Sequence, residues 1–120
     1  MDEIKRLEVD NYWVDSTIIE AGSYVFVGYC MGNEGGTIDE QINGAFDVLE
    51  KRLKMANLDL DSVVKMDCLF KNIDDLNCLT IIIKKRFGNK YPVRKAFTTD
   101  FIREGILFQI DAIAYKGKIN

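Results

Sequence analysis

Hydrophobic and polar residues alternate along most of the chain, and their spacing predicts six strands and two helices. Alternation with a period of two favours a half-buried strand, whereas a repeat of three to four residues favours a helix with one apolar stripe. We predict helices near residues 38–56 and 73–87, and strands near residues 5–11, 13–19, 23–31, 62–71, 93–98 and 106–115. This order predicts the α+β fold class, as a single domain over residues 1–120 with a mixed sheet.

The first three predicted strands differ in the burial that their patterns suggest. Residues 5–11 and 13–19 are short segments that we interpret as two edge strands. Residues 23–31 are apolar on both faces, which is typical of a strand inside a sheet. Gly28 interrupts this strand, and it indicates a bulge, the close approach of a ligand, or a packing demand alone.

Capping residues mark the predicted helix ends. Thr37 followed three positions later by Glu40 is a capping box, and it predicts the start of the first helix. We expect Asn57 to take the left-handed conformation at the end of that helix. Asn72 is predicted to begin the second helix, and Gly88 is predicted to end it.

Two helices can cover only one face of such a sheet. The other face must carry part of an apolar set that is too large to leave in water, with polar residues among it. The apolar set is Val25, Val27, Tyr29, Leu107, Ile113 and Tyr115, and the polar residues are Gln109 and Asp111. We therefore expect identical subunits to bury this face, with clefts between them lined by the same mixture of residues.

The composition limits the classes of partner. The chain has 120 residues, 48% of them hydrophobic, and a formal net charge of −3. This fits one globular domain and supplies no basic field that would attract nucleic acid or an anionic membrane. No apolar run approaches the roughly 18 residues of a membrane span, and the N-terminus lacks the apolar region of a signal peptide. We expect a cytoplasmic protein.

The residue types present exclude several kinds of chemistry. The chain contains no histidine, which excludes histidine-dependent triads and histidine-ligated metal sites. Cys30, Cys68 and Cys78 show no C-x-x-C spacing, and we expect them to be reduced. We expect no metal and no cofactor.

Arg94 is the best candidate for binding an anion. Pro92 restricts Tyr91 to an extended conformation, so Arg94 enters the predicted strand from a defined direction. A guanidinium group can bind a carboxylate or a phosphate through two parallel hydrogen bonds. The alternative is a surface salt bridge within the chain.

Several short motifs, in this order, resemble those of the RidA family, also called YjgF or L-PSP proteins. They are Glu40-Gln41 with Ala45, Leu49 and Leu53; Asp61-x-Val63-Val64-Lys65; Asn72-x-Asp74-Asp75; Phe87 before Pro92-x-Arg94; and Ile110-x-Ala112-Ile113-Ala114. The resemblance covers nearly the whole chain. It implies a chorismate-mutase-like fold, assembled as a trimeric barrel with a ligand cleft at each subunit interface.

The resemblance also implies an activity and a set of site residues. Arg94 matches the family's arginine, which binds the carboxylate of an imine or enamine acid such as 2-aminoacrylate, and water then releases ammonia and the keto acid. The implied catalytic positions are Arg94 and Gln109, and the implied substrate-binding set is Arg94, Gly28, Tyr29, Cys30, Trp13 and Phe87. Tyr12 or Trp13 would form an aromatic lid, although either ring could equally belong to the core.

Two positions depart from the pattern of active family members. Gln109 stands where deaminating members carry a glutamate that activates water, and an amide cannot exchange its proton usefully. Ala96 replaces a cysteine that many members have. Asp111 faces the same side as Gln109 and could take over the role, or could make a structural ion pair or a sheet hydrogen bond.

The resemblance implies three possible functions. Enamine or imine deamination is the leading hypothesis. A non-catalytic metabolite-binding or regulatory trimer, which would keep Arg94 but lack the water-activating acid, is the alternative. The endoribonuclease or translation-inhibitor activity that labels some family members fits the acidic charge poorly.

Overall fold

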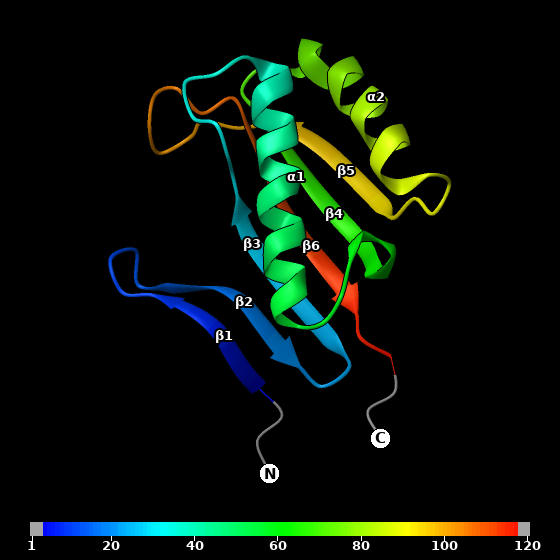
Figure 1. Cartoon of the computed structure of the whole chain (residues 1–120). Coiled ribbons are helices and arrows are strands. Elements are labelled where there is room, and N and C mark those ends of the chain that lie inside the picture. Colours follow the sequence, from blue (N-terminus) through cyan, green and yellow to red (C-terminus); the bar gives the residue numbers. More distant parts are fainter. Residues whose placement is uncertain (1–3, 118–120) are drawn as a thin grey trace.

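The computed structural model describes residues 4–117 as one six-stranded sheet with two helices (Figure 1). The elements in chain order are β1 Ile4–Asp10, β2 Asp15–Ala21, β3 Tyr24–Cys30, α1 Ile38–Met55, β4 Val63–Phe70, α2 Leu76–Phe87, β5 Val93–Thr98 and β6 Phe108–Tyr115. Short 3-10 helices at Leu60–Ser62 and Ile73–Asp75 precede β4 and α2. The predicted fold class and the predicted order of helices and strands are confirmed.

The sheet is mixed and has the strand order β1-β2-β3-β6-β4-β5. β4 and β5 are parallel, and every other neighbouring pair is antiparallel. β2 lies inside the sheet between β1 and β3, so the prediction that it is an edge strand was wrong. Asp10 accepts hydrogen bonds from the backbone N–H groups of Tyr12 and Trp13 at 2.9 and 3.1 Å. Because these bonds form a turn, β2 begins only at Asp15.

Both helices lie on one face of the sheet, which we call the covered face (Figure 1). Val25 and Val27 are only 0% and 3% exposed and lie on this face, so they are not among the members of the predicted apolar set that the uncovered face carries. Tyr24 and Phe26, at 46% and 45% exposed, occupy the uncovered face instead. Alternation shows which side chains share a face, but it does not show which face the helices cover.

Local capping signals place the helix ends. Thr37 Oγ1 accepts the Glu40 N–H at 3.2 Å, and Glu40 Oε1 accepts the Thr37 N–H at 2.8 Å, which confirms the capping box. Asn57 and Gly88 both have positive φ values, of 61° and 65°, at the two helix ends where they were predicted. Asn72 caps the 3-10 turn rather than α2 itself, so the second helix begins later than predicted.

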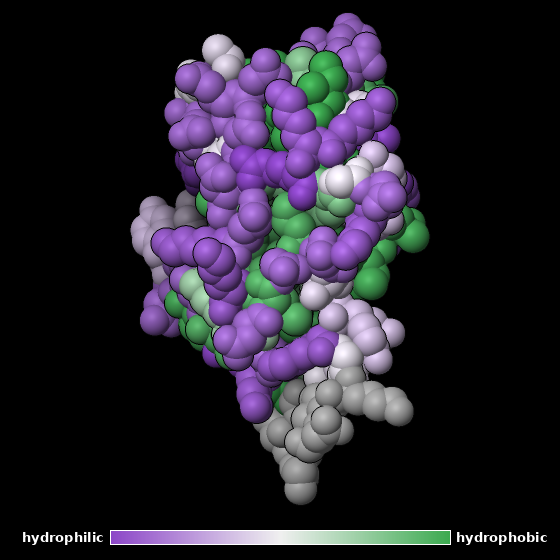
Figure 2. All heavy atoms as spheres, turned by 45° about the vertical axis from the view of Figure 1, so that its right-hand side comes forward, coloured by the Kyte–Doolittle hydropathy of each residue, from purple (hydrophilic) through white to green (hydrophobic). Residues whose placement is uncertain are grey.

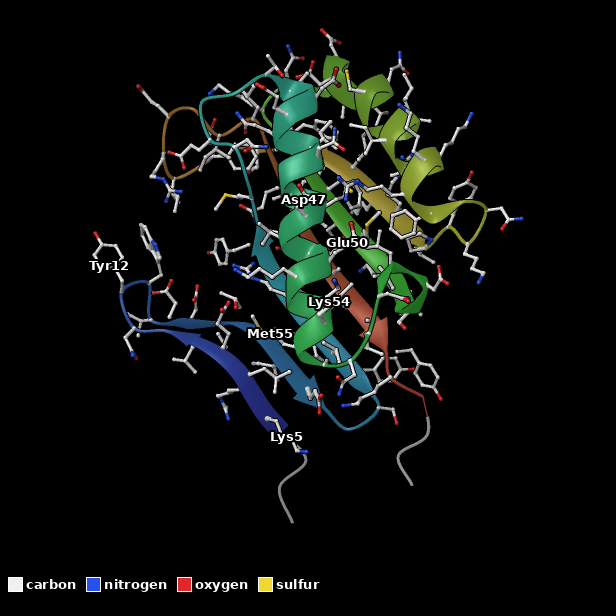
Figure 3. The ribbon with its side chains drawn as sticks, viewed as in Figure 1. Lys5, Tyr12, Asp47, Glu50, Lys54 and Met55 are labelled. Carbon is white, nitrogen blue, oxygen red and sulfur yellow. The ribbon has the colours of Figure 1, made fainter. Side chains whose placement is uncertain are left out.

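The two helices are joined by the guanidinium group of Arg86 on α2. It contacts Glu50 at 2.5 Å, Asp47 at 3.0 Å and the Asn43 side chain at 3.0 Å, all on α1. Figure 3 shows Asp47 and Glu50 on neighbouring turns of α1. The clamp fixes α2 beside α1 and therefore fixes the helix wall beside β5.

The outer side of the helix layer is mostly polar. Figure 2, which turns the right-hand side of Figure 1 forward, shows hydrophilic side chains over most of this view, with apolar atoms in narrow strips between them. No helix within residues 4–117 is both long enough and apolar enough to cross a membrane.

Candidate functional site

Arg94 lies on edge strand β5, beside a hollow between this strand and α2. The hollow has a volume of about 390 Å³ and is lined by Met66, Thr80, Ile83, Lys84, Tyr91, Pro92 and Arg94. Arg94 pairs in register with the fully buried Met66, so its side chain shares the covered face. Within residues 4–117 no carboxylate pairs with Arg94. Its guanidinium group is therefore free to bind an external anion.

Gln109 lies on the opposite face of the sheet from Arg94. On β6 it stands between Phe108 and Ile110, which are both fully buried under the helices, so Gln109 points to the uncovered face. Its cross-strand neighbour on β4 is Leu69. One chain by itself therefore does not bring the two implied catalytic residues together.

β3 contains a bulge at the predicted position. Val27 pairs with Ala112 and Cys30 pairs with Ile110, so Gly28 and Tyr29 together oppose the single residue Asp111. Tyr29 has a φ of 55°, in the left-handed region that residues with side chains seldom adopt. Asp111 Oδ1 accepts the Tyr29 N–H at 3.0 Å. Asp111 thus makes a structural hydrogen bond to the backbone of this bulge.

The packing of the chain does not require glycine at residue 28. A Cβ at this position would meet only Asp111 Oδ1, at 3.8 Å, which is an ordinary van der Waals contact. Gly28 also has no positive φ that would favour glycine. The predicted bulge is confirmed, whereas a packing demand within the chain is not observed, and the close approach of a ligand to Gly28 stays a prediction.

A second hollow lies on the uncovered face beside Gly28. It has a volume of about 290 Å³, and its lining includes Ser16, Ile19, Phe26, Lys65, Asp67, Asp111 and Ile113. Asp67 stands directly opposite Asp111 on the neighbouring strand. Its Oδ1 atom is buried and, among the described residues, has no hydrogen-bond partner. An unpaired buried oxygen costs about 1–3 kcal/mol, so a donor supplied from outside the chain would stabilise this face.

A third hollow contains the predicted aromatic residues. It has a volume of about 320 Å³ and lies where the β1–β2 turn separates from β3; Trp13, Tyr29 and Arg52 are among its lining residues. Tyr12 lies at the tip of the turn (Figure 3) and packs edge-to-face on Trp13 with ring centroids 5.1 Å apart. Tyr12 and Trp13 are 83% and 51% exposed, so neither belongs to the core of the chain. Of the two rings, Trp13 lines the hollow.

Cys30 and Phe87, which were predicted to contact substrate, are both buried in the core. Phe87 packs against Phe46 with ring centroids 5.8 Å apart. Burial raises the pKa of the Cys30 and Cys68 thiols to about 12, so neither is a thiolate nucleophile near neutral pH. Contact of Cys30 or Phe87 with a ligand stays a prediction.

The predicted residues are therefore spread over three hollows. Arg94 lines the first, Gly28 the second, and Trp13 and Tyr29 the third. Across residues 4–117, no group of three or more His, Cys, Asp or Glu side chains is placed to hold a metal ion.

The sequence interpretation missed Arg52, which donates to the carbonyl groups of Gly28 and Tyr29. Its position between Leu49 and Leu53, at the edge of the apolar stripe of α1, was the available signal.

Residues 5–116 match the family described as Endoribonuclease L-PSP. The chain belongs to this family. The match confirms the resemblance to RidA, YjgF or L-PSP proteins that the sequence motifs indicated.

A solved structure shows the same fold over nearly all of the chain. It is that of a hypothetical protein from Streptococcus pyogenes M1 GAS, a member of the yjgF family. It has a TM-score of 0.95 and 41% sequence identity, covering 99% of this chain and 100% of that chain. The arrangement of six strands and two helices is therefore that of a YjgF protein.

Curated relatives carry two kinds of name. The human 2-iminobutanoate/2-iminopropanoate deaminase is 30% identical over 84 residues, which is 70% of this chain and 61% of that protein. A Lactococcus lactis protein, AldR, provisionally named as a regulator, is 31% identical over 80 residues, which is 67% of this chain and 64% of that protein. The match thus spans less than two thirds of the length of either relative.

Proposed function

We propose that this protein binds small carboxylates through Arg94, in a cleft that a second copy of the chain completes. The observation that carries the proposal is the guanidinium group of Arg94, which has no carboxylate partner within residues 4–117 and borders a hollow with an apolar floor. Hydrogen bonds to charged groups contribute about 1.5–3 kcal/mol each. A bidentate carboxylate would satisfy two donors of this group at once.

Features on both faces of the sheet support the proposal that a second copy of the chain completes the cleft. A ligand that touches Arg94 and Gln109 needs them from different chains, because in one chain they point to opposite faces. The uncovered face also carries the exposed rings of Tyr24 and Phe26 and the Asp67 oxygen that no described residue pairs. A homotrimer, as the family resemblance implies, would bury this face and place neighbouring hollows in one cleft.

The proposed substrate is a small 2-imino or enamine acid, in keeping with the deaminase relative. Arg94 would hold its carboxylate, and water would add to the imine carbon. The carbon–nitrogen bond would then break, releasing ammonia and the keto acid. Gln109 can orient this water by hydrogen bonding but cannot remove its proton. We therefore propose that hydrolysis by the unmodified protein is slow.

A non-catalytic role in metabolite binding or regulation is the second candidate. It is favoured by the amide of Gln109, and by the relative that is provisionally named as a regulator. Both candidates require the same carboxylate site and differ only in turnover. Ribonuclease activity has less support, because the net charge of −3 gives no field that would attract RNA.

Calorimetric titration with a panel of short 2-keto acids tests the carboxylate site. Arg94→Ala should reduce the affinity for the best ligand more than about 100-fold, since two charge-assisted hydrogen bonds are lost. The variant should keep its oligomeric state. Lys85→Ala is the matched control, because Lys85 is an exposed cation on α2 outside the Arg94 hollow. Unchanged affinity in Arg94→Ala would refute the anion anchor.

Gly28→Ala tests whether the second hollow belongs to the same cleft. Space for a methyl group exists within the chain, so the variant should fold with unchanged or slightly higher stability. In the cleft the same methyl group should reduce carboxylate affinity. Loss of folding would show that packing within the chain selects glycine. Unchanged affinity in a folded variant would place the ligand away from Gly28.

A further inference from the structure

The Gly28–Tyr29 bulge is held from both faces of the sheet. Asp111 accepts the Tyr29 N–H at 3.0 Å. From the helix layer, Arg52 Nη1 donates to the Gly28 carbonyl oxygen at 2.6 Å and to the Tyr29 carbonyl oxygen at 3.0 Å. Both carbonyl groups of the bulge therefore point toward Arg52, on the covered face.

Arg52 reaches this position from within the apolar contact between α1 and the sheet. Its neighbours Leu49 and Leu53 are fully buried, and its own side chain is only 16% exposed. The charge is balanced by Glu8 on β1, whose Oε1 atom lies 3.6 Å from Arg52 Nε. A charged group in such surroundings is costly unless its donors are satisfied, and here the acceptors are the backbone of the bulge and Glu8.

The conformation of Tyr29 needs these contacts. A left-handed φ is unfavourable for a residue with a side chain, and it persists only where the surroundings stabilise it. The Arg52 contacts keep the two carbonyl groups away from the uncovered face. As a result, Gly28 borders the second hollow with its Cα rather than with a carbonyl oxygen. Without Arg52, the peptide between Gly28 and Tyr29 could rotate and present its carbonyl oxygen to that hollow.

We infer that Arg52 is a positioning residue for the carboxylate cleft. It acts through the backbone of Gly28 and Tyr29, and it fixes the wall against which the ligand would lie. Together with Asp111 it forms a two-sided clamp on the bulge. The inference rests on the proposed function for its effect on binding, whereas its effect on the bulge can be measured independently.

The test compares Arg52→Met, Arg52→Lys and a control, Arg86→Met. Arg86→Met removes another arginine with several hydrogen bonds, but one that joins α1 to α2 away from β3. Two quantities are measured for each folded variant: the hydrogen exchange of the Tyr29 amide by NMR, and the dissociation constant for the best 2-keto acid. Thermal unfolding of each variant reports general stability.

Arg52→Met should raise both the Tyr29 exchange rate and the dissociation constant by about tenfold, as expected when one hydrogen-bonding interaction is lost. Arg52→Lys should restore part of the protection of the Tyr29 amide and part of the ligand affinity, since an ammonium group keeps the charge and can reach one carbonyl group. Arg86→Met should lower the unfolding temperature and leave the Tyr29 exchange unchanged. It is the control for the Tyr29 amide only, because Arg86 also holds the α2 wall of the Arg94 hollow.

Two outcomes would overturn the inference. One is a folded Arg52→Met protein that is less stable but has an unchanged Tyr29 amide and unchanged affinity, because Arg52 would then be structural only. The other is an equal response of the Tyr29 amide to Arg86→Met. If the unmodified protein binds no carboxylate, the proposed function fails, and the Tyr29 amide alone decides whether the clamp exists. If Arg52→Met does not fold, Arg52→Lys decides by the same two readouts.

Discussion

The two faces of the sheet are built from the same alternating strands, yet they have different roles. On β6, Ile110 and Ala112 are buried beneath the helices, whereas Asp111 and Ile113, which alternate with them, face the uncovered side. The covered face is apolar throughout its centre, and the uncovered face mixes aromatic rings with Lys65, Asp67 and Asp111. Aromatic rings are enriched at protein–protein interfaces, and a few polar groups among apolar side chains are typical of ligand sites.

The covered face should control the stability of each chain. Phe70→Ala removes a fully buried ring that packs 5.0 Å from the Phe108 ring centroid. The free energy of unfolding should fall by about 3–5 kcal/mol, through lost burial and the cavity that remains. Urea denaturation measures this change. A loss below about 1 kcal/mol would show that this face is not the main core.

The uncovered face should control the chemistry. Gln109→Glu places a carboxylate where the protein has an amide, with little change in size. If the cleft is otherwise complete, the turnover of 2-aminoacrylate, generated in a coupled assay, should rise by up to about 10²- to 10⁴-fold. The affinity for 2-keto acids should not improve, and its measurement is the control.

Two results would change the view of Gln109. If the unmodified protein already matches fully active deaminases, no carboxylate is required at this position, and Asp111 or the carboxylate of the substrate becomes the candidate. If Gln109→Glu folds, binds and stays inactive, the metabolite-binding function is favoured and the deaminase proposal should be abandoned.

Self-association should depend on Phe26, which is the counterpart of Phe70 on the uncovered face. Its side chain is 45% exposed in the single chain and lies across from Ile19 and Ile113. Phe26→Ala should shift the equilibrium toward monomers, and the loss of stability should increase on dilution. Light scattering across a concentration series measures the shift. A monomeric unmodified protein at micromolar concentration would contradict the proposed role of this face.

Alkaline pH should weaken the covered face through its two buried thiols. Burial raises the pKa of Cys30 and Cys68 from 9.0 to about 12. Above pH 9 the unfolded chain releases these protons while the folded chain keeps them, so stability falls as the pH rises from about 9 to about 12. Between pH 7 and pH 10 each thiol should contribute a loss of about 1.4 kcal/mol.

Cys68→Ala separates this effect from the titration of other groups. Compared with the unmodified protein, its stability should fall less steeply between pH 9 and pH 10, whatever its stability at pH 7. Urea denaturation at each pH measures the slope. An unchanged slope would mean that Cys68 is not protected from ionisation in the folded protein.

Local chemistry made the fold predictable. The Thr37–Glu40 capping box and the left-handed residues Asn57 and Gly88 act within a few residues, so the sequence contains all of their determinants. The start of β2 was misjudged because the Asp10 carboxylate organises a turn that hydrophobic alternation does not reveal. Alternation did not show that Val25 and Val27 lie on the covered face, because the side on which the helices pack is a tertiary property.

The site was less predictable because it depends on contacts between layers. The motif around Arg94 identified a candidate anchor, but whether a carboxylate neutralises it depends on residues distant in sequence. Because the bulge reverses the alternation at Tyr29, Gly28 lines the second hollow and Tyr29 lines the third. The position of Arg52 at the edge of the apolar stripe of α1 showed that its side chain lies near the sheet. Its partners, the Gly28 and Tyr29 carbonyl groups, lie 24 and 23 residues away in sequence, so no local pattern could identify them.

The central proposal is a carboxylate cleft shared between two copies of the chain, and subunit mixing tests it most directly. Arg94→Ala removes the anchor from one hollow, and Gly28→Leu fills another hollow on the opposite face. Each variant alone should fail to bind 2-keto acids. When the two are unfolded and refolded together in equal amounts, about one quarter of the clefts should combine an intact Arg94 with an intact Gly28. Calorimetry should then detect binding at that fraction of sites, whereas a mixed protein that binds no ligand would contradict the shared cleft.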